Sequence, residues 1–409
     1  MRILALSTWW PEPADNGSRL RIAHLLRALA TRHEVHLLAL TQEPITSSQI
    51  DAVRSYCASV ESRPERHWTP RRGEQIASLW HATPSSLRAT WDPEFAAMVQ
   101  RQVAVLKPDL VIAFALRAAV YAPLAGAIPC IFEEVEIGNY HTDVANAATP
   151  RRKLRSWLTL AKHRNFMRRL MAQFDGVTVV SEAEAALVQP LLRATTRLAV
   201  IANGADVAGC APFISEPEPA TLIYPGALSF DPNFDAMQFF LSDIFPLIRA
   251  QRPDVHLRIT GKAHPERQAA LPQHAGVEYT GYVTDVRPLI ARSWATVIPL
   301  RYGGGTRLKA LESIALGTPL VTTPKGIEGL AFACGQQVLC AEQATDFARA
   351  TLQLLGDATL RRQLAASAQV IVAEQYDWRA IGSRLADLGA AVVAAGHRAG
   401  RQPLAHSKH

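Results

Sequence analysis

The sequence contains no hydrophobic run long enough to cross a membrane, because no apolar stretch reaches the roughly 18 residues that a spanning helix needs. It contains no long low-complexity segment, and 48% of its 409 residues are hydrophobic, which is typical of a globular protein. The apolar residues that open the chain are too few for a signal peptide and are expected to form a buried strand. A chain of this length exceeds one compact core, so we expect two domains.

Cysteine is also scarce. The five cysteines are odd in number and lack metal-ligand spacing: Cys57, Cys130, Cys210, Cys334 and Cys340. We therefore expect reduced thiols in a cytoplasmic protein. The sequence has no HExxH motif, no paired CxxC motif and no cluster of His and Asp residues with ligand spacing. We expect neither a tightly bound metal ion nor a resident cofactor.

Acidic residues are absent between Val144 and Phe174, although the net charge of the whole chain is only +7. Eight cations lie in this segment: Arg151, Arg152, Lys153, Arg155, Lys162, Arg164, Arg168 and Arg169. Apolar residues are interleaved with them: Leu154, Trp157, Leu158, Ala161 and Met167. Such a helix can rest on anionic phospholipid at the inner face of the membrane or meet a polyanionic acceptor. The alternative is a domain helix whose basic face is only solvated. Nucleic acid is disfavoured, because no recognition motif accompanies the charge.

Short apolar runs alternate with helical patterns along the chain, which indicates an α/β fold with parallel sheets. In the first half, the expected strands are Arg2–Ser7, Glu34–Leu40, Asp109–Ala113, Ile128–Phe132, Gly176–Val180 and Arg197–Ile201. In the second half, they are Thr221–Tyr224, Val255–Thr260, Val277–Thr280, Ala295–Pro299, Pro319–Thr322 and Gln337–Leu339. Besides the basic segment, the expected helices are Ser18–Thr31, Pro93–Leu106, Asp235–Gln251, Asp285–Arg292, Thr306–Leu316, Ala344–Leu355 and Ala358–Gln375. Each half can build its own doubly wound sheet.

The two halves meet at Asn203–Pro219, which mixes glycine, proline and acids without periodicity, as a linker does. We expect one domain over residues 1–205, a linker over 206–219 and a second domain over 220–376. A last helix over 377–395 can pack back on the first domain, and residues 396–409 form a polar tail. The expected ligand site is a cleft where the carboxyl ends of both sheets face each other.

A run of three glycines, Gly303–Gly305, follows the apolar run Ala295–Leu300. Glycine permits the close backbone approach that a bulky anion requires, and the helix that follows offers unpaired N–H groups and a positive dipole end. Arg307 and Lys309 add positive charge to the first turn, where the dipole alone favours acids. Glu312 lies about two turns further along, placed to accept hydrogen bonds from the hydroxyls of a ribose. The alternative is a glycine-rich turn with a solvated Arg/Lys pair.

Three more strand ends in the second half carry glycine, namely Gly226, Gly261 and Gly281, and Lys262 adds a cation beside the second of them. One glycine at such a turn is weak evidence, since strand–helix turns often need it. Four glycine-marked strand ends in one domain favour a nucleotide-diphosphate site.

The loop after the first strand has a single glycine, Gly17, before a helix that Ser18 can cap. Gly17 would let backbone amides face the ligand, and Arg19 or Arg21 can reach a phosphate. The loop lacks the G-x-G-x-x-G spacing of a dinucleotide site. The alternative is a turn with a structural glycine and a capping serine.

Candidate acids and bases of the first half follow the strand that ends at Phe132. They are Glu133, Glu134, Glu136 and His141, and they can orient an acceptor hydroxyl. The alternative is that one or two of the carboxylates cap the next element and the rest are solvated. We expect one of the three carboxylates to be functional, and the sequence does not say which.

These residues resemble those of a known family. The segment from Pro299 to Val321 is similar to the motif P-L-x-x-G-G-G-T-R-L-K-x-L-E-x-x-A-x-G-x-P-[LV]-V of a sub-branch of the GT-B glycosyltransferases, group 1 or GT4. Weaker matches include the Gly17 loop and Phe174–Glu182, so the resemblance covers nearly the full chain. It implies two Rossmann-like domains facing across a cleft, with a nucleotide-sugar donor held mainly by the second domain and an acceptor held mainly by the first. It also implies retaining, metal-independent hexosyl transfer to a glycan or lipid-linked glycan in bacterial surface polysaccharide or glycolipid synthesis.

The resemblance assigns roles to particular residues. Glu312 is similar to the ribose-binding second Glu of the family's E-x7-E pair, and Val283 to the residue whose backbone meets the base. Arg307 and Lys309 fall where cations can neutralise the leaving diphosphate. The expected donor-binding set is Gly17, Gly226, Asn233, Gly261, Lys262, Val283, Gly303, Gly304, Gly305 and Thr306.

Two positions depart from the wider family. Gly304 stands where the first Glu of the pair touches the transferred sugar, so the identity of that sugar is open. The stretch from Gly226 to Asn233 lacks the usual Arg and Lys, whose charge Arg307 and Lys309 can replace. Two other functions stay open: an epimerase of nucleotide sugars, which needs acid/base pairs on both cleft faces, and a relative that binds nucleotide sugars without turnover.

Overall fold

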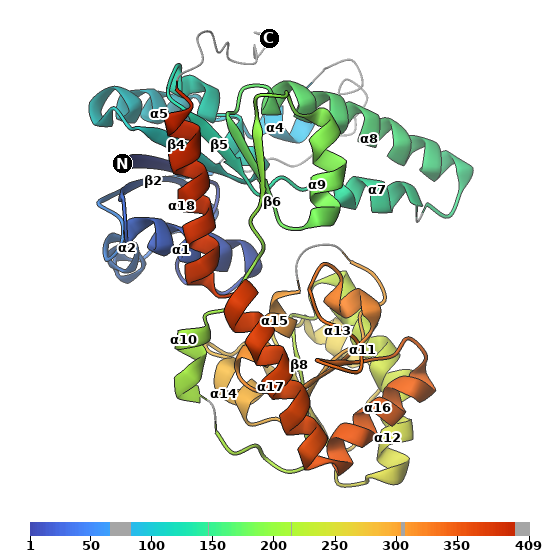
Figure 1. Cartoon of the computed structure of the whole chain (residues 1–409). Coiled ribbons are helices and arrows are strands. Elements are labelled where there is room, and N and C mark those ends of the chain that lie inside the picture. Colours follow the sequence, from blue (N-terminus) through green and yellow to red (C-terminus); the bar gives the residue numbers. More distant parts are fainter. Residues whose placement is uncertain (66–82, 146, 214, 304–306, 397–409) are drawn as a thin grey trace. The chain divides into compact units, whose positions relative to one another are not determined.

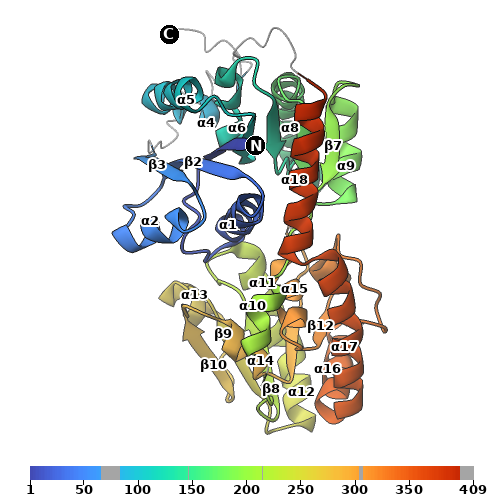
Figure 2. The same ribbon diagram turned by 60° about the vertical axis from the view of Figure 1, so that its left-hand side comes forward.

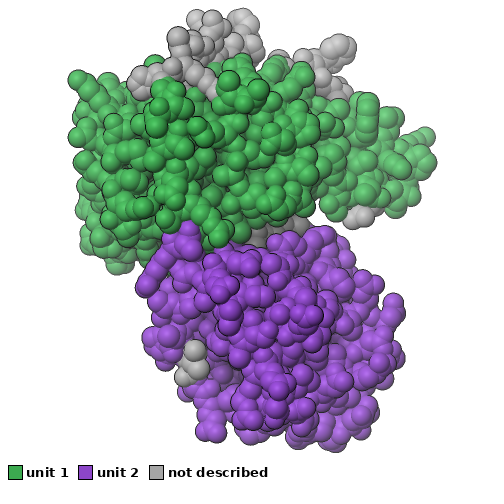
Figure 3. All heavy atoms as spheres, in the orientation of Figure 1, with its two compact units in different colours: residues 1–202, 381–409 green, residues 203–380 purple. Residues whose placement is uncertain are grey.

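A computed structural model describes residues 1–65, 83–145, 147–213, 215–303 and 307–396. The chain divides into two compact units (Figure 3). Unit 1 comprises Met1–Ala202 and the C-terminal segment from Ile381, and unit 2 comprises Asn203–Ala380.

Unit 1 is built on a parallel sheet in the order β3-β2-β1-β4-β5-β6-β7 (Figure 1). Its strands are β1 (Arg2–Ser7), β2 (Glu34–Thr41), β3 (Ser59–Pro64), β4 (Leu110–Phe114), β5 (Cys130–Glu133), β6 (Gly176–Val179) and β7 (Arg197–Val200). Six of them were expected from their apolar runs. β3 was missed because this edge strand, SVESRP, is polar and only partly buried.

The helices of unit 1 are α1 (Gly17–Ala30), α2 (Ser47–Arg54), α4 (Ser85–Ala89), α5 (Pro93–Leu106), α6 (Ala115–Ala119), α7 (Gly138–Ala145), α8 (Pro150–Met171) and α9 (Glu182–Val188). The predicted cap of α1 was wrong. The side chain of Asn16, not that of Ser18, accepts the hydrogen bond from the Arg19 N–H. The cap therefore lies two residues earlier, because an Asn carbonyl oxygen caps a helix at least as well as a hydroxyl.

The last helix, α18 (Trp378–Ala394), contributes its residues from Ile381 onward to unit 1. Gly382 allows α18 to lie close to α1, since a Cβ there would be 2.1 Å from the Cβ of Ala28. Gly389 does the same against Leu110, where a Cβ would lie 2.9 Å from a methyl group.

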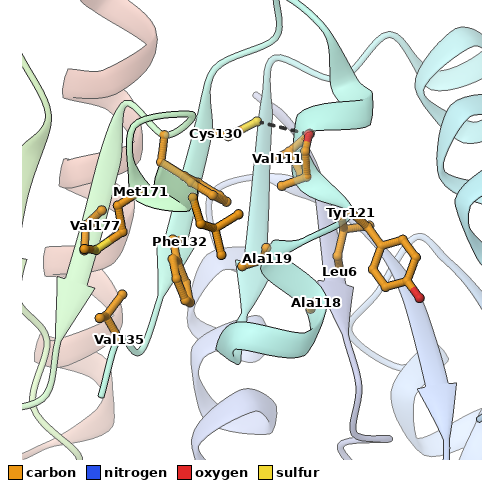
Figure 4. Packing of buried hydrophobic residues seen from close by; sticks show 14 of the residues in the cluster. Leu6, Val111, Ala118, Ala119, Tyr121, Cys130, Phe132, Val135, Met171 and Val177 are labelled. Atoms are coloured by element: carbon orange, nitrogen blue, oxygen red, sulfur yellow. Dashed lines mark hydrogen bonds between the residues drawn. The ribbon is translucent and has the colours of Figure 1, made fainter. Parts of the chain in front are cut away.

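The core of unit 1 fills the space between the central strands and the helices that cover them (Figure 4). Leu6, Val111 and Phe132 come from neighbouring strands and are fully buried. Tyr121 packs edge-on against Phe95 with a centroid distance of 4.9 Å. The strands are apolar on both faces because helices cover both sides of a parallel sheet.

Unit 2 is built on a parallel sheet in the order β10-β9-β8-β11-β12-β13 (Figure 2). Its strands are β8 (Thr221–Pro225), β9 (His256–Thr260), β10 (Val277–Gly281), β11 (Ala295–Ile298), β12 (Leu320–Thr322) and β13 (Leu339–Cys340). Its helices are α10 (Val207–Cys210), α11 (Asp231–Phe239), α12 (Phe245–Gln251), α13 (Pro265–Ala270), α14 (Arg287–Ala291), α15 (Leu308–Ala315), α16 (Ala344–Gly356) and α17 (Ala358–Gln375). This strand order is that of a Rossmann sheet.

The helix expected over Asp235–Gln251 is interrupted. A π-helical turn, Phe240–Ile244, separates α11 from α12. Pro246 stands in the first turn of α12, and its missing N–H breaks the regular hydrogen-bond ladder at this point.

The expectation of five reduced thiols was wrong. Cys334 and Cys340 form a disulfide with a Cα–Cα distance of 5.4 Å, whereas the other three cysteines are free and buried. An isolated bridge between Cys334 and Val338 folds this loop back on itself, so the two thiols meet across a local turn.

Candidate active site

The four glycine-marked strand ends of unit 2 lie side by side. They belong to β10, β9, β8 and β11, which are consecutive in the sheet. All four strands run parallel, so their carboxyl ends share one edge of the sheet. The chain order reverses between β8 and β11, and ligands of such sheets bind at the carboxyl ends beside this switch point.

Gly261 and Gly303 have backbone geometry that favours glycine over any residue with a side chain. Gly261 has a φ of +104°, and a Cβ there would lie 2.6 Å from the backbone nitrogen of Ala227. The end of β9 therefore touches the loop after β8, backbone against backbone. Gly303 has a φ of +115°, a conformation that side-chain-bearing residues rarely adopt.

Lys309 of α15 reaches across the switch point to β8. Its ammonium donates to the hydroxyl of Tyr224 at 3.0 Å and to Oδ1 of Asn233 at 2.8 Å. The Tyr224 hydroxyl in turn donates to the same Asn233 oxygen at 2.8 Å. A Cβ at Gly226 would lie 2.6 Å from the Lys309 ammonium, so the glycine leaves room for the cation. Burial, aided by repulsion from Arg307, lowers the pKa of Lys309 from 10.5 to about 7.

Arg307 is a buried cation beside the start of α15. It is 6% exposed and occupies the position just before the helix begins, not the first turn as expected. Its guanidinium donates to the backbone oxygens of Lys325 at 3.0 Å and Gly303 at 2.8 Å, and lies 3.5 Å from the Glu328 carboxylate. Arg307 thus ties Gly303 to the segment that follows β12, and desolvation by burial lowers the pKa of Arg307.

Glu312 lies on α15 near the start of α14 and the end of α10. Burial raises the pKa of its carboxyl group from 4.5 to about 7, although Arg287 opposes this shift. Arg287 is engaged elsewhere, since it pairs with Asp285 at 2.8 Å and donates to the Gly209 oxygen at 3.1 Å. Within the described part of the chain, the Glu312 carboxylate accepts no hydrogen bond. Its oxygens are therefore free for hydroxyl donors.

The other expected donor-binding residues differ in exposure. Asn233 is buried in the Lys309 network, Val283 is half-buried and Lys262 is exposed, with its ammonium 5.0 Å from the centre of the Tyr282 ring. The predictions at Gly304, Gly305 and Thr306 fall outside the residues that the structure describes.

In unit 1, Glu133 is paired with a buried arginine. The guanidinium of Arg21 donates through Nε to the Glu133 carboxylate at 3.0 Å and through Nη2 to the Ile201 backbone oxygen at 2.8 Å. Both side chains of the pair are fully buried. Arg21 therefore joins α1 to β5 and to the end of β7, and the expectation that it reaches a phosphate was wrong. Its position four residues before buried Leu25, on the same helix face, is a sequence signal for this burial.

Glu134, the next residue, differs from Glu133 in its backbone conformation and in the contacts of its carboxylate. It has a left-handed backbone with a φ of +63°, and its N–H donates to the hydroxyl of Thr178 at 2.9 Å. Its carboxylate lies 3.9 Å from the Arg21 Nε and accepts no hydrogen bond from the described residues. Burial, aided by the charges of Glu133 and Glu136, raises its pKa to about 7 despite Arg21. A strained, half-buried and unsatisfied carboxyl group at a strand end is typical of a functional position.

The helix that follows is capped by none of the three expected carboxylates. Glu184 of α9 accepts hydrogen bonds from the N–H groups of Ile137 and Gly138. Glu136 is exposed and accepts from Asn139 at 2.9 Å, and His141 lies half-buried in α7. The structure thus separates the acidic cluster by exposure into a fully buried Glu133 paired with Arg21, a half-buried Glu134 and an exposed Glu136.

The loop with Gly17 carries the remaining candidates. Arg19 pairs with Asp15 at 3.1 Å, and its guanidinium lies 5.8 Å from the centre of the Trp9 ring. It also lines a small cavity of about 30 Å³ at the ends of β1 and β2, together with Glu12. Gly17 is exposed at the start of α1.

Two Rossmann-like sheets, each in its own unit of the chain, define the GT-B class of α/β enzymes. The chain belongs to the glycosyltransferases of group 1 and family 4. Residues 219–357 match the family described as "Glycosyl transferases group 1", and residues 16–208 match "Glycosyltransferase Family 4".

Curated and solved proteins agree with this family. The chain is 30% identical to a glycogen synthase of Mycobacterium tuberculosis over 219 residues. The matched segment covers 50% of this chain and 50% of that protein, so the chain spans about half the length of this relative. Sucrose-phosphate synthase from Thermosynechococcus elongatus has a similar structure, with a TM-score of 0.66, 17% identity and coverage of 97% of this chain and 100% of that one. Anabaena HepE, in complex with UDP and glucose, gives a TM-score of 0.62 and 17% identity over 95% of this chain and 99% of the other. At such identities the two structures support the fold alone.

Proposed function

We propose that the protein transfers a hexose from a nucleotide-diphosphate sugar to a glycan or lipid-linked glycan in bacterial surface polysaccharide or glycolipid synthesis. The bond between the anomeric carbon and the diphosphate oxygen breaks, and a bond to an acceptor hydroxyl oxygen forms. The hydroxyl proton passes to the departing diphosphate. The anomeric configuration is retained and no metal ion takes part.

The observation that carries this proposal is the position of Lys309. A cation at the switch point of a Rossmann sheet lies where the diphosphate of a nucleotide binds. Its hydrogen bonds to Tyr224 and Asn233 fix the ammonium before the donor arrives. A preorganised cation stabilises the negative charge that develops on the leaving diphosphate, and it needs no rearrangement during the reaction.

Glu312 supplies the second contact with the donor. Its carboxylate, about one helical turn beyond the start of α15, can accept hydrogen bonds from the two ribose hydroxyls. Arg307 acts mainly by holding the glycine loop through the carbonyl of Gly303. The UDP complex of HepE supports a uridine nucleotide as one candidate donor.

On the acceptor side, Glu134 is the best placed of the candidates, which also include Glu133, Glu136, His141 and Arg19. Glu133 is fully buried and paired with Arg21, whereas the half-buried carboxylate of Glu134 accepts no hydrogen bond from the described residues. It can accept a hydrogen bond from the attacking hydroxyl and orient its oxygen. The basic segment on α8 would hold the protein at the cytoplasmic face of the membrane, where lipid-linked acceptors lie.

The test is to incubate the full chain with candidate nucleotide sugars and acceptors, and to follow nucleotide release and product mass. Release that depends on acceptor, with a product heavier by one hexose, is the expected result. An isomerised sugar without release would indicate epimerisation instead. Tight binding with neither outcome would indicate a protein that binds nucleotide sugars without turnover.

A further inference from the structure

The helix α8 carries large apolar side chains on its outward side. Leu154, Trp157 and Leu158 are 60%, 54% and 49% exposed, and they lie within five consecutive residues. The other described large hydrophobic side chains that are this exposed are separated from one another in the sequence: Val105, Phe230, Tyr282 and Val370. Exposed apolar side chains that cluster in this way usually mark a contact surface.

Helix geometry places these residues on one stripe. At about 100° per residue, Leu154, Trp157, Leu158 and the exposed Ala161 fall within an arc of about 100°. We call these four residues the outer face of α8. The buried residues of the helix lie on the opposite side, against unit 1: Leu160, Phe166, Met167, Leu170 and Met171. Because the inner side is already packed, the outer face is a second apolar surface.

Cations flank the outer face on both sides. By the same rotation, Arg151 and Arg155 lie on one flank, and Lys153 and Arg164 lie on the other. All four are exposed, and residues 144–174 contain no acid. An apolar stripe between two rows of cations is the pattern of a helix that lies in a membrane interface.

We propose that the outer face of α8 inserts into the interfacial region of a phospholipid bilayer that contains anionic lipids. The three large apolar side chains enter the acyl boundary, and the flanking cations contact phosphate groups. Among the described residues, no helix is long and apolar enough to span the bilayer. This membrane contact rests on the proposed function, because it would bring the enzyme to a lipid-linked acceptor. The experiment that tests the contact does not require transferase activity.

A bilayer fits better than a soluble polyanionic glycan. A glycan would satisfy the cations but would leave Leu154 and Leu158 exposed to water. Only a partner with an apolar interior also removes these side chains from water, which adds a favourable term to the contacts of the cations. Figure 1 shows α8 beside α7 on unit 1.

The experiment measures binding of the full chain to vesicles of phosphatidylcholine alone and of phosphatidylcholine with phosphatidylglycerol, by co-sedimentation without nucleotide. We expect binding only to the anionic vesicles, weakening as salt rises. The triple variant Leu154→Ser/Trp157→Ser/Leu158→Ser should lose about 100-fold in affinity, because three partly exposed apolar side chains no longer insert. Val105→Ser, which alters an equally exposed residue of α5, is the matched control and should bind normally.

A second measurement separates insertion from surface contact. Brominated lipids should quench part of the Trp fluorescence of the wild-type protein, and Trp157→Phe should abolish that quenching. No binding to anionic vesicles at low salt would overturn the proposal, as would a triple variant that binds like wild type. Binding to a soluble polyanionic glycan but not to vesicles would overturn it in favour of a polyanionic acceptor. Since no donor is present, none of these results depends on transferase activity.

Discussion

Replacing Lys309 by Met removes the charge at the switch point while nearly preserving the length of the side chain. In the variant, the hydroxyl of Tyr224 still donates to Asn233 at 2.8 Å, so no buried acceptor loses its last donor. We therefore expect the free energy of unfolding to fall by only about 1 kcal/mol. In contrast, kcat/KM should fall by about 10²- to 10³-fold, because a fixed cation no longer stabilises the leaving diphosphate.

The pH dependence of kcat/KM tests the roles of Lys309 and Glu312 in a second way. Burial lowers the pKa of Lys309 to about 7 and raises that of Glu312 to about 7. Donor capture needs the charged form of both, so kcat/KM should rise to a maximum near neutral pH and fall on either side. Lys309→Met should remove the alkaline limb, and Glu312→Gln should remove the acidic limb.

Stability should respond to pH with a definite sign at Lys309. Between pH 7 and 10.5 the unfolded chain binds a proton that the folded chain does not, so the free energy of unfolding should rise with pH across this range. Lys309→Met should lack that rise. Urea unfolding and steady-state kinetics of the wild type, Lys309→Met and the exposed-site control Lys107→Met provide the measurements. If kcat/KM of Lys309→Met still falls at alkaline pH as it does in the wild type, Lys309 is not the group whose titration causes that fall.

Three further substitutions test other parts of the site. Glu312→Ala should raise the donor KM and lower kcat/KM by about 10²-fold through loss of the ribose contact, and unchanged kinetics would remove that role. Glu134→Gln should raise the acceptor KM about tenfold and leave the donor KM unchanged. The exposed-site control Glu182→Gln should alter neither KM. If the two variants change the acceptor KM equally, Glu134 has no specific acceptor role. Arg21→Met should lower the free energy of unfolding by about 3–5 kcal/mol in urea titrations, because Glu133 is left as an unpaired buried charge, and adding Glu133→Leu should restore much of it. Failure of the second change to rescue stability would show that the pair is not the cause.

Most of the fold follows from local pattern. The central strands are continuous apolar runs because both faces of a parallel sheet are covered, and such runs are visible in the sequence. The edge strand β3 is polar and carries no such signal. The π-helical turn before Pro246 and the disulfide between Cys334 and Cys340 depend on local backbone geometry that residue spacing does not express.

The residue types of the candidate site could be proposed from the sequence, but the hydrogen bonds that connect them could not. The glycines and Lys309 were identified from the motif, but the network that holds the ammonium was not. Tyr224 and Asn233 lie 85 and 76 residues away in sequence, and only the order of β8 and β11 brings them together. Likewise, the separation of Glu133 from Glu134 depends on a buried arginine 112 residues away from the first of them.

We propose that unit 2 binds the nucleotide diphosphate of a sugar donor through Lys309 and Glu312. Isothermal titration of the full chain with UDP and GDP at pH 7 measures this binding without an acceptor. We expect one binding site for one of the two nucleotides, with an affinity at least about tenfold weaker in both Lys309→Met and Glu312→Ala. Absence of binding by either nucleotide, or affinities unchanged in both variants, would contradict it.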